Sequence, residues 1–209
     1  MYDTPCNATY GCCGCDDCVG QFEDISHRLD RFAYLDELIG WPKKTHWKAP
    51  QALEPETYWT RYPTADEEVV MTMLSINHAA KGIVMWDFPT SPEILHVTDA
   101  LASVLTTEPV SHFLLSTPIV QQLSVNGAGR VDAAAWIDQG RILVSVVNLN
   151  AHDLDGVIAI HLPSTHGPVK SVEISTLWGE VEWHVAGHGK ELWTRGLPGL
   201  GFSLLVLNL

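Results

Sequence analysis

Hydrophobic and polar positions change their period about halfway along the chain. Up to about residue 109, apolar residues recur at helical spacing in three stretches, with short apolar runs between them. From about residue 110 onward, short β-rich runs alternate with turn signals. The change predicts an α/β region followed by an antiparallel β region, with no low-complexity linker between them.

Three helices are expected in the first region. One follows Ser26, whose hydroxyl can cap it, and ends at Gly40. The second begins at a capping box, Thr64–Glu67, and runs to about Ala80. The third covers about residues 96–106. Strands are expected at residues 46–53 and 82–88, and strands that alternate with helices in this order are typical of parallel βα units.

Eight short β-rich runs occupy the second region. Turn signals divide them at Asn126-Gly127, Gln139-Gly140, Asp155-Gly156 and Pro198-Gly199. This spacing predicts an antiparallel β-sandwich. We therefore expect two domains, residues 1–108 and residues 109–209.

Composition narrows the classes of function. The chain of 209 residues has 25 acidic and 12 basic side chains and a formal net charge of −13. Such a chain repels phosphate backbones, so nucleic acid is not an expected partner. No stretch of the sequence is long and apolar enough to span a membrane. The ten histidines are scattered and form no metal-ligand motif, and no cofactor is expected.

All five cysteines lie near the start of the chain, at Cys6, Cys12, Cys13, Cys15 and Cys18. Cys15 and Cys18 form a C-x-x-C pair, a spacing that suits zinc or redox chemistry. We favour disulfides among Cys6, Cys13, Cys15 and Cys18, and the alternatives are a metal site and free thiols. Because adjacent cysteines can hardly bond each other, Cys12 or Cys13 is expected to be the spare thiol, and we favour Cys12.

Asn7 begins an N-glycosylation sequon inside this cysteine cluster. A sequon beside clustered cysteines indicates an oxidising, extracellular compartment. The first residues do not show the positively charged stretch and apolar run of a signal peptide, and this conflict with secretion disappears if Met1 is not the natural start. We therefore expect a secreted protein of which this chain is a part.

Five motifs of the first region, taken in their order along the chain, carry a resemblance to a known family. They are YDTP (2–5), WKAPQAL (47–53), YWTRYPTADEE (58–68), HAAKG (78–82) and IVMWDF (83–88). Together they resemble the last third of a (β/α)8-barrel glycoside hydrolase. The likeness is to secreted fungal glycosidase-like proteins that carry a Cys-rich loop and a C-terminal β-sandwich, and it covers about residues 1–108.

The resemblance implies that residues 2–5 end the sixth strand of the barrel, and that residues 46–53 and 82–88 supply the seventh and eighth. The N-terminal half of the barrel would then lie outside this chain, and an unclosed barrel leaves hydrogen-bonding edges bare. The expected fold is a partial (β/α)8 barrel, the last three βα units, followed by an antiparallel β-sandwich.

The resemblance also implies a carbohydrate substrate, bound at the carboxyl ends of the strands. Asp3 and Asp87 would be the catalytic carboxylates. The residues expected to contact the sugar are Tyr2, Gln51, Trp59, Arg61 and Trp86. The indole of Trp86 could stack on a pyranose. For Arg61, an ion pair with Glu54 or Glu56 is the alternative, and Glu67 and Glu68 are expected to be helix-start charges.

Glycoside hydrolysis needs two carboxyl groups. In the resembled superfamily they follow strands four and seven; strand four is not in this chain, and Gln51 stands where many relatives have glutamate. We therefore expect a glycoside hydrolase fragment whose catalytic pair is incomplete. The alternatives are a non-catalytic carbohydrate-binding protein and a metal-binding protein built on the cysteine cluster.

Four tryptophans fall in the predicted sandwich: Trp136, Trp178, Trp183 and Trp193. Apolar alternation alone explains them, so we expect them to pack the core. The alternative is that some of them form a sugar-binding face.

Overall fold

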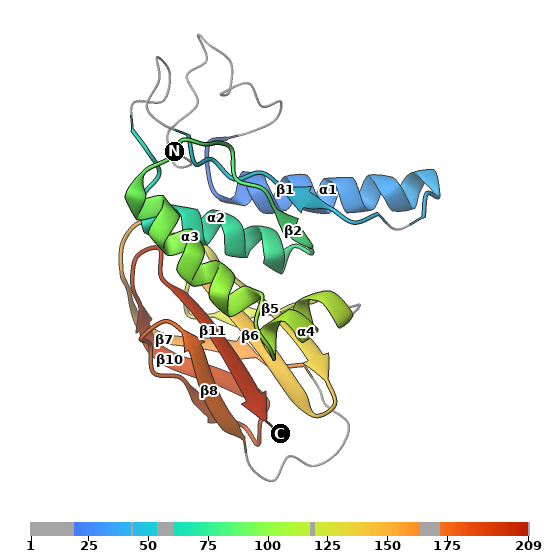
Figure 1. Cartoon of the computed structure of the whole chain (residues 1–209). Coiled ribbons are helices and arrows are strands. Elements are labelled where there is room, and N and C mark those ends of the chain that lie inside the picture. Colours follow the sequence, from blue (N-terminus) through green and yellow to red (C-terminus); the bar gives the residue numbers. More distant parts are fainter. Residues whose placement is uncertain (1–18, 43, 54–60, 118–119, 164–171, 209) are drawn as a thin grey trace. The chain divides into compact units, whose positions relative to one another are not determined.

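The computed structural model describes residues 19–42, 44–53, 61–117, 120–163 and 172–208 (Figure 1). The chain divides into two compact units, Met1–Val97 and Thr98–Leu209. The domain division expected after residue 108 stays a prediction.

The first unit is a mixed α/β structure, as the sequence predicts. It contains α1 (Glu23–Ile39), β1 (Trp47–Lys48), α2 (Ala65–Asn77), β2 (Gly82–Ile83) and the start of α3 (Pro92–Leu105). Strands β1 and β2 pair in parallel and form a two-stranded sheet. The described residues of this unit do not close a barrel.

Helix α2 begins where the capping box predicts. The hydroxyl of Thr64 accepts a hydrogen bond from the Glu67 amide at 3.2 Å, and the Glu67 carboxylate accepts one from the Thr64 amide at 2.8 Å. Two amide groups at the helix start are thereby satisfied. The helix is buried along almost its whole length, so local capping and tertiary packing agree here.

The expected cap of α1 at Ser26 is wrong. The helix begins at Glu23, and Ser26 lies inside it, where its hydroxyl donates to the Glu23 carbonyl at 2.9 Å. The start is organised instead by the carboxylate of Asp24, which accepts the amides of Gly20 at 2.8 Å and Gln21 at 3.1 Å. The end at Gly40, with a left-handed φ of 71°, is confirmed.

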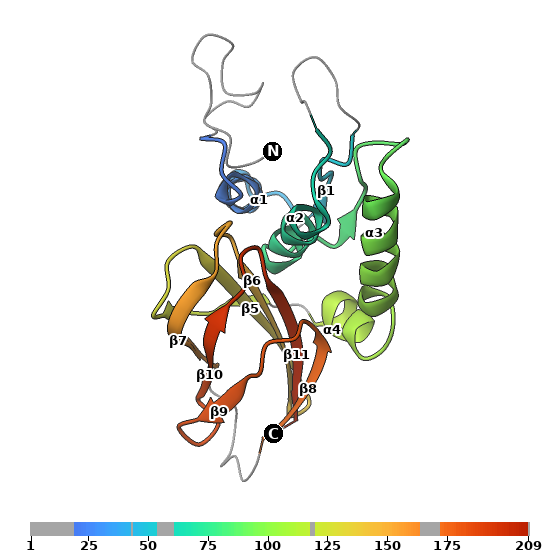
Figure 2. The same cartoon turned by 90° about the vertical axis from the view of Figure 1, so that its left-hand side faces the viewer.

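The second unit contains the end of α3, a short helix α4 (Val110–Ser116) that the sequence pattern did not predict, and antiparallel strands. One sheet has the order β3-β5-β6-β11-β8 and the other β4-β7-β10-β9. The strands are β3 (Val120–Gln122), β4 (Val125–Asn126), β5 (Val131–Asp138), β6 (Arg141–Asn148), β7 (Leu154–His161), β8 (Glu173–Trp178), β9 (His184–Ala186), β10 (Glu191–Leu197) and β11 (Phe202–Asn208). The two sheets face each other in Figure 2, which confirms the predicted sandwich.

Alternating apolar residues of both sheets form the sandwich core, for example Val144, Ile158 and Leu205. Trp136 and Trp183 are buried, as expected. Trp178 and Trp193 are only partly buried. Trp193 alternates along β10 with the buried side chains of Leu192 and Thr194, so it points to the opposite face of the strand.

Two buried asparagines tie together three turns at one end of the sandwich. The Asn148 amide nitrogen donates to the Pro198 carbonyl at 2.7 Å, and its oxygen accepts both the backbone amide and the side-chain amide of Asn150, at 3.0 and 2.8 Å. Asn150 in turn donates to the Gly129 carbonyl at 3.0 Å. Buried polar groups are costly unless paired, so this network depends on each member.

Replacing Asn148 by alanine is expected to lower the free energy of unfolding by about 3 kcal/mol, because it leaves several buried polar groups without partners. Urea denaturation followed by circular dichroism measures the change. The matched control is Asn126→Ala, which removes a single exposed hydrogen bond to His161 and should cost less than about 1 kcal/mol. Equal losses in the two variants would contradict the role given to the network.

Candidate functional site

The parallel pairing of the first unit extends beyond the two short strands. The Lys81 amide donates to the His46 carbonyl at 2.9 Å, the Val84 amide to Lys48 at 3.0 Å and the Trp86 amide to Pro50 at 2.8 Å. The ladder ends in a parallel bridge between Gln51 and Trp86. Both residues therefore lie at the carboxyl-terminal edge of the pair, where the sequence predicts them.

Three side chains at this edge form what we call the strand-end site: Gln51, Trp86 and Asp87. Trp86 is 63% exposed, so its indole does not fill a core, and Asp87 is exposed beside it. Gln51 is half-buried, and its side-chain oxygen is buried with no hydrogen-bond partner in the described part of the chain. The site thus combines an open aromatic face, a carboxylate and a half-buried amide.

Arg61 forms an ion pair with Glu67, while the two partners suggested by the sequence, Glu54 and Glu56, lie outside the described residues. Its guanidinium donates to both carboxylate oxygens of Glu67, at 2.6 and 2.7 Å, and to the Tyr62 carbonyl at 2.8 Å. This bidentate ion pair stabilises the first turn of α2. A contact between Arg61 and a sugar stays a prediction.

Glu67 and Glu68 are neighbours with opposite surroundings. Burial by itself would raise the pKa of Glu67, but hydrogen bonds from Arg61 and from the Thr64 amide outweigh it and lower that pKa to about 2. Glu68 is fully buried, and neither of its carboxylate oxygens has a hydrogen-bond partner in the described residues. Burial, with the charge of Glu67, raises the pKa of Glu68 to about 8. The expectation of two helix-start charges therefore holds for Glu67 and is wrong for Glu68.

Several predicted residues lie outside the described part of the chain. They are Tyr2, Asp3, Asn7, Trp59 and the five cysteines at positions 6, 12, 13, 15 and 18. Their expected roles stay predictions.

Neither a metal centre nor a membrane span is found in the described part of the chain. No three or more histidine, cysteine, aspartate or glutamate side chains gather there in a way that could hold a metal ion. None of its helices is both long enough and apolar enough to cross a lipid bilayer.

No protein-family description and no curated protein matches this chain, but solved structures with a similar fold exist. The maltogenic alpha-amylase AmyB of Thermotoga neapolitana matches with a TM-score of 0.56 and 13% identity, over 90% of this chain and 48% of its own. A debranching enzyme of Nostoc punctiforme matches with a TM-score of 0.54 and 15% identity, over 84% and 38%. The chain thus spans less than half of either protein, and its fold is similar to that of glycoside hydrolases over most of its own length.

Ionisation of Glu68 should make the chain less stable as the pH rises. Its pKa is about 8 in the folded chain against a usual value of 4.5, so the folded state holds this proton more tightly than the unfolded state. The stability contributed is complete below about pH 4.5 and is lost between about pH 4.5 and 8, by at most about 5 kcal/mol. Because glutamine does not ionise, Glu68→Gln should raise the melting temperature more at pH 8 than at pH 5.

Glu67→Gln is the matched control one position away. The lowered pKa of Glu67 means that its carboxylate stabilises the fold above about pH 4.5 and stops doing so as the pH falls towards about 2. Glu67→Gln should therefore lower the melting temperature at pH 7, opposite in sign to Glu68→Gln. A pH-independent difference between the Glu68→Gln variant and the unmodified chain would refute the assignment for Glu68.

Proposed function

We propose that this chain belongs to a secreted glycoside hydrolase-like protein and binds carbohydrate at the strand-end site. The observation that carries the proposal is the exposed indole of Trp86 beside Gln51 and Asp87, in a fold similar to that of glycoside hydrolases. The sequon at Asn7 and the clustered cysteines support secretion.

Each group of the strand-end site has a use in binding a sugar. An indole face stacks on the C–H face of a pyranose ring. The side-chain amide nitrogen of the half-buried Gln51 can donate a hydrogen bond to a sugar hydroxyl. The carboxylate of Asp87 offers two acceptors to neighbouring hydroxyls.

Malto-oligosaccharides are the first probes to use. The two solved structures named above are a maltogenic alpha-amylase and a debranching enzyme, and we carry a glucan ligand over to this chain as part of the proposal. Xylan and β-glucan oligosaccharides complete the panel, because a shared fold does not fix the sugar.

Trp86→Ala is expected to weaken maltoheptaose binding by about tenfold or more, since it removes the stacking face. Isothermal titration calorimetry on the 209-residue chain measures the affinity. Trp41→Ala is the control, because Trp41 is a second exposed tryptophan of the same unit, 53% exposed, and lies outside the strand-end site. Unchanged affinity in Trp86→Ala for every sugar that the chain binds would sink the proposal.

Binding without hydrolysis is the second candidate function, and the amide at Gln51 favours it. Glutamine cannot act as nucleophile or base, so the strand-end site supplies one carboxyl group, whereas hydrolysis needs two. We expect the chain to release no reducing sugar from maltoheptaose and Asp87→Asn to lower only its affinity, by a few-fold. Release of reducing sugar that Asp87→Asn abolishes would show instead that the chain hydrolyses glycosidic bonds.

A further inference from the structure

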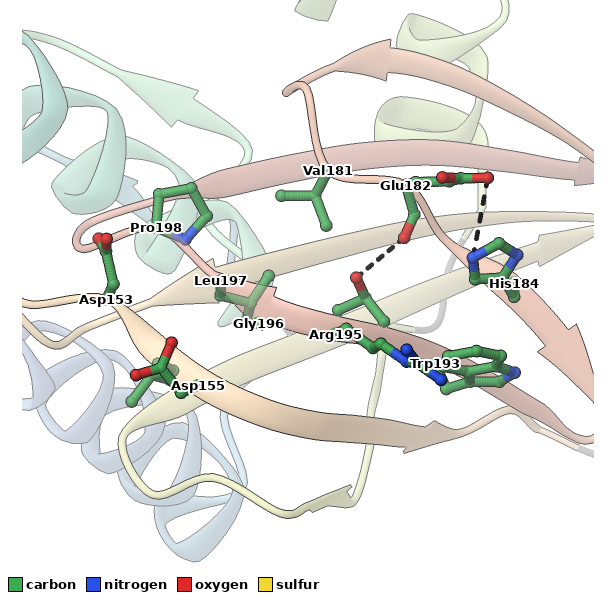
Figure 3. Close-up of a pocket in the computed structure, with 12 residues that line it drawn as sticks. Asp153, Asp155, Val181, Glu182, His184, Trp193, Arg195, Gly196, Leu197 and Pro198 are labelled. Carbon is green, nitrogen blue, oxygen red and sulfur yellow. Dashed lines mark hydrogen bonds and ion pairs between the residues drawn. The ribbon is translucent and has the colours of Figure 1, made fainter.

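A pocket of about 610 Å³ lies in the second unit, on the sheet that contains β7, β10 and β9. Its walls come from β10, from the residues at the start of β7 and from the segment before β9 (Figure 3). The pocket has the volume of an ordinary ligand site. It lies entirely within the second unit, so it is separate from the strand-end site.

An aromatic pair forms one end of this pocket. The rings of Trp193 on β10 and His184 on β9 lie 4.6 Å apart, centre to centre, at an interplanar angle of 32°. The two residues are direct cross-strand partners, and on the other side of Trp193 the partner strand β7 presents only the methyl group of Ala159. No large side chain of β7 therefore stands opposite the indole.

Hydrogen bonds hold the walls of the pocket in place. The Thr194 hydroxyl donates to the Glu182 carbonyl at 2.8 Å and fixes the segment before β9 against β10. The Gly199 amide donates to the Asp153 carboxylate at 2.8 Å. Figure 3 shows Asp153 and Asp155 towards one end and Trp193 with His184 at the other. Hydrogen bonds between side chains and the backbone therefore fix the positions of the pocket walls.

Both unused donors and unused acceptors line the pocket. Within the described part of the chain, the exposed guanidinium of Arg195 has no hydrogen bond or ion pair, and neither has the Asp155 carboxylate. Glu182 adds a further carboxylate, 3.8 Å from the His184 ring nitrogen. Arginine supplies only donors, and an ionised carboxylate supplies only acceptors.

We propose that this pocket is a second carbohydrate site, which binds a neutral pyranose against Trp193. Sugar hydroxyls both donate and accept, so different hydroxyls of one ligand can pair with Arg195 and with Asp155. The carboxylates of Asp153, Asp155 and Glu182 would repel an anionic ligand, and the guanidinium of Arg195 would repel a cationic ligand. The aromatic pair and the mixed lining therefore favour a neutral polyhydroxyl ligand.

The test measures maltoheptaose binding by calorimetry in a Trp86→Ala background of the full chain, which removes the proposed strand-end site. Trp193→Ala and Arg195→Ala are each expected to weaken the remaining binding by about tenfold or more. Trp178→Ala and His161→Ala are the controls, because one removes another partly buried tryptophan of the unit and the other an exposed histidine of the same sheet. Both should leave the affinity unchanged.

The experiment distinguishes a loss of binding from a loss of folding, and binding at the pocket from binding at the strand-end site. Circular dichroism checks each variant, and Arg195→Ala, which removes an exposed side chain, keeps the test valid if Trp193→Ala fails to fold. Unchanged binding in Arg195→Ala, with or without a folded Trp193→Ala, overturns the proposal even where Trp86 proves essential. Binding only of the cationic glucosamine hexamer or of anionic trigalacturonate, or no binding of any of these three probes, also overturns it.

Discussion

The parallel backbone ladder between residues 46–52 and 81–86 is the constraint on which the surface of the first unit depends. Parallel strands bring their carboxyl ends to the same edge, so this ladder alone places Gln51 beside Trp86, although the whole of α2 separates them in sequence. The indole of Trp47 packs directly over Gly82, where any Cβ would collide with the ring. Glycine at this position therefore allows the approach that sets the register of the site.

In the same unit, the surroundings of two neighbouring glutamates shift the pKa values of their carboxyl groups in opposite directions. Glu67 and Glu68 have the same side chain and adjacent positions. Among the described residues, however, the carboxylate of Glu67 accepts hydrogen bonds from an arginine and a backbone amide, and that of Glu68 accepts neither. Hydrogen bonding stabilises the ionised form of the first, and burial penalises it in the second. A buried acid without a partner lowers stability at neutral pH, and such residues are more common at functional sites than elsewhere in proteins.

Much of the fold could be predicted because its signals are local. The capping box at Thr64 and the alternating strands of the second unit each lie within a short window of sequence. The start of α1 could not be predicted in this way. A serine can cap a helix at several positions in this stretch of sequence, and in the structure it is Asp24 whose carboxylate accepts the Gly20 amide at the helix start. The burial of Glu68 and the pairing of Trp193 with His184 depend on tertiary packing and cross-strand register, which periodicity does not encode.

The strand-end site and the pocket on β10 share one chemical character that bears on function. Each has an indole that is exposed or partly exposed, and beside it polar side chains that can form hydrogen bonds with hydroxyl groups. At the strand-end site the group beside Asp87 is the amide of Gln51. On β10, Asp153 already accepts a backbone amide, while the guanidinium of Arg195 lies among the acids. Under the two proposals, an indole would stack on a sugar ring at each site while the neighbouring polar groups hydrogen-bond the hydroxyls of that sugar.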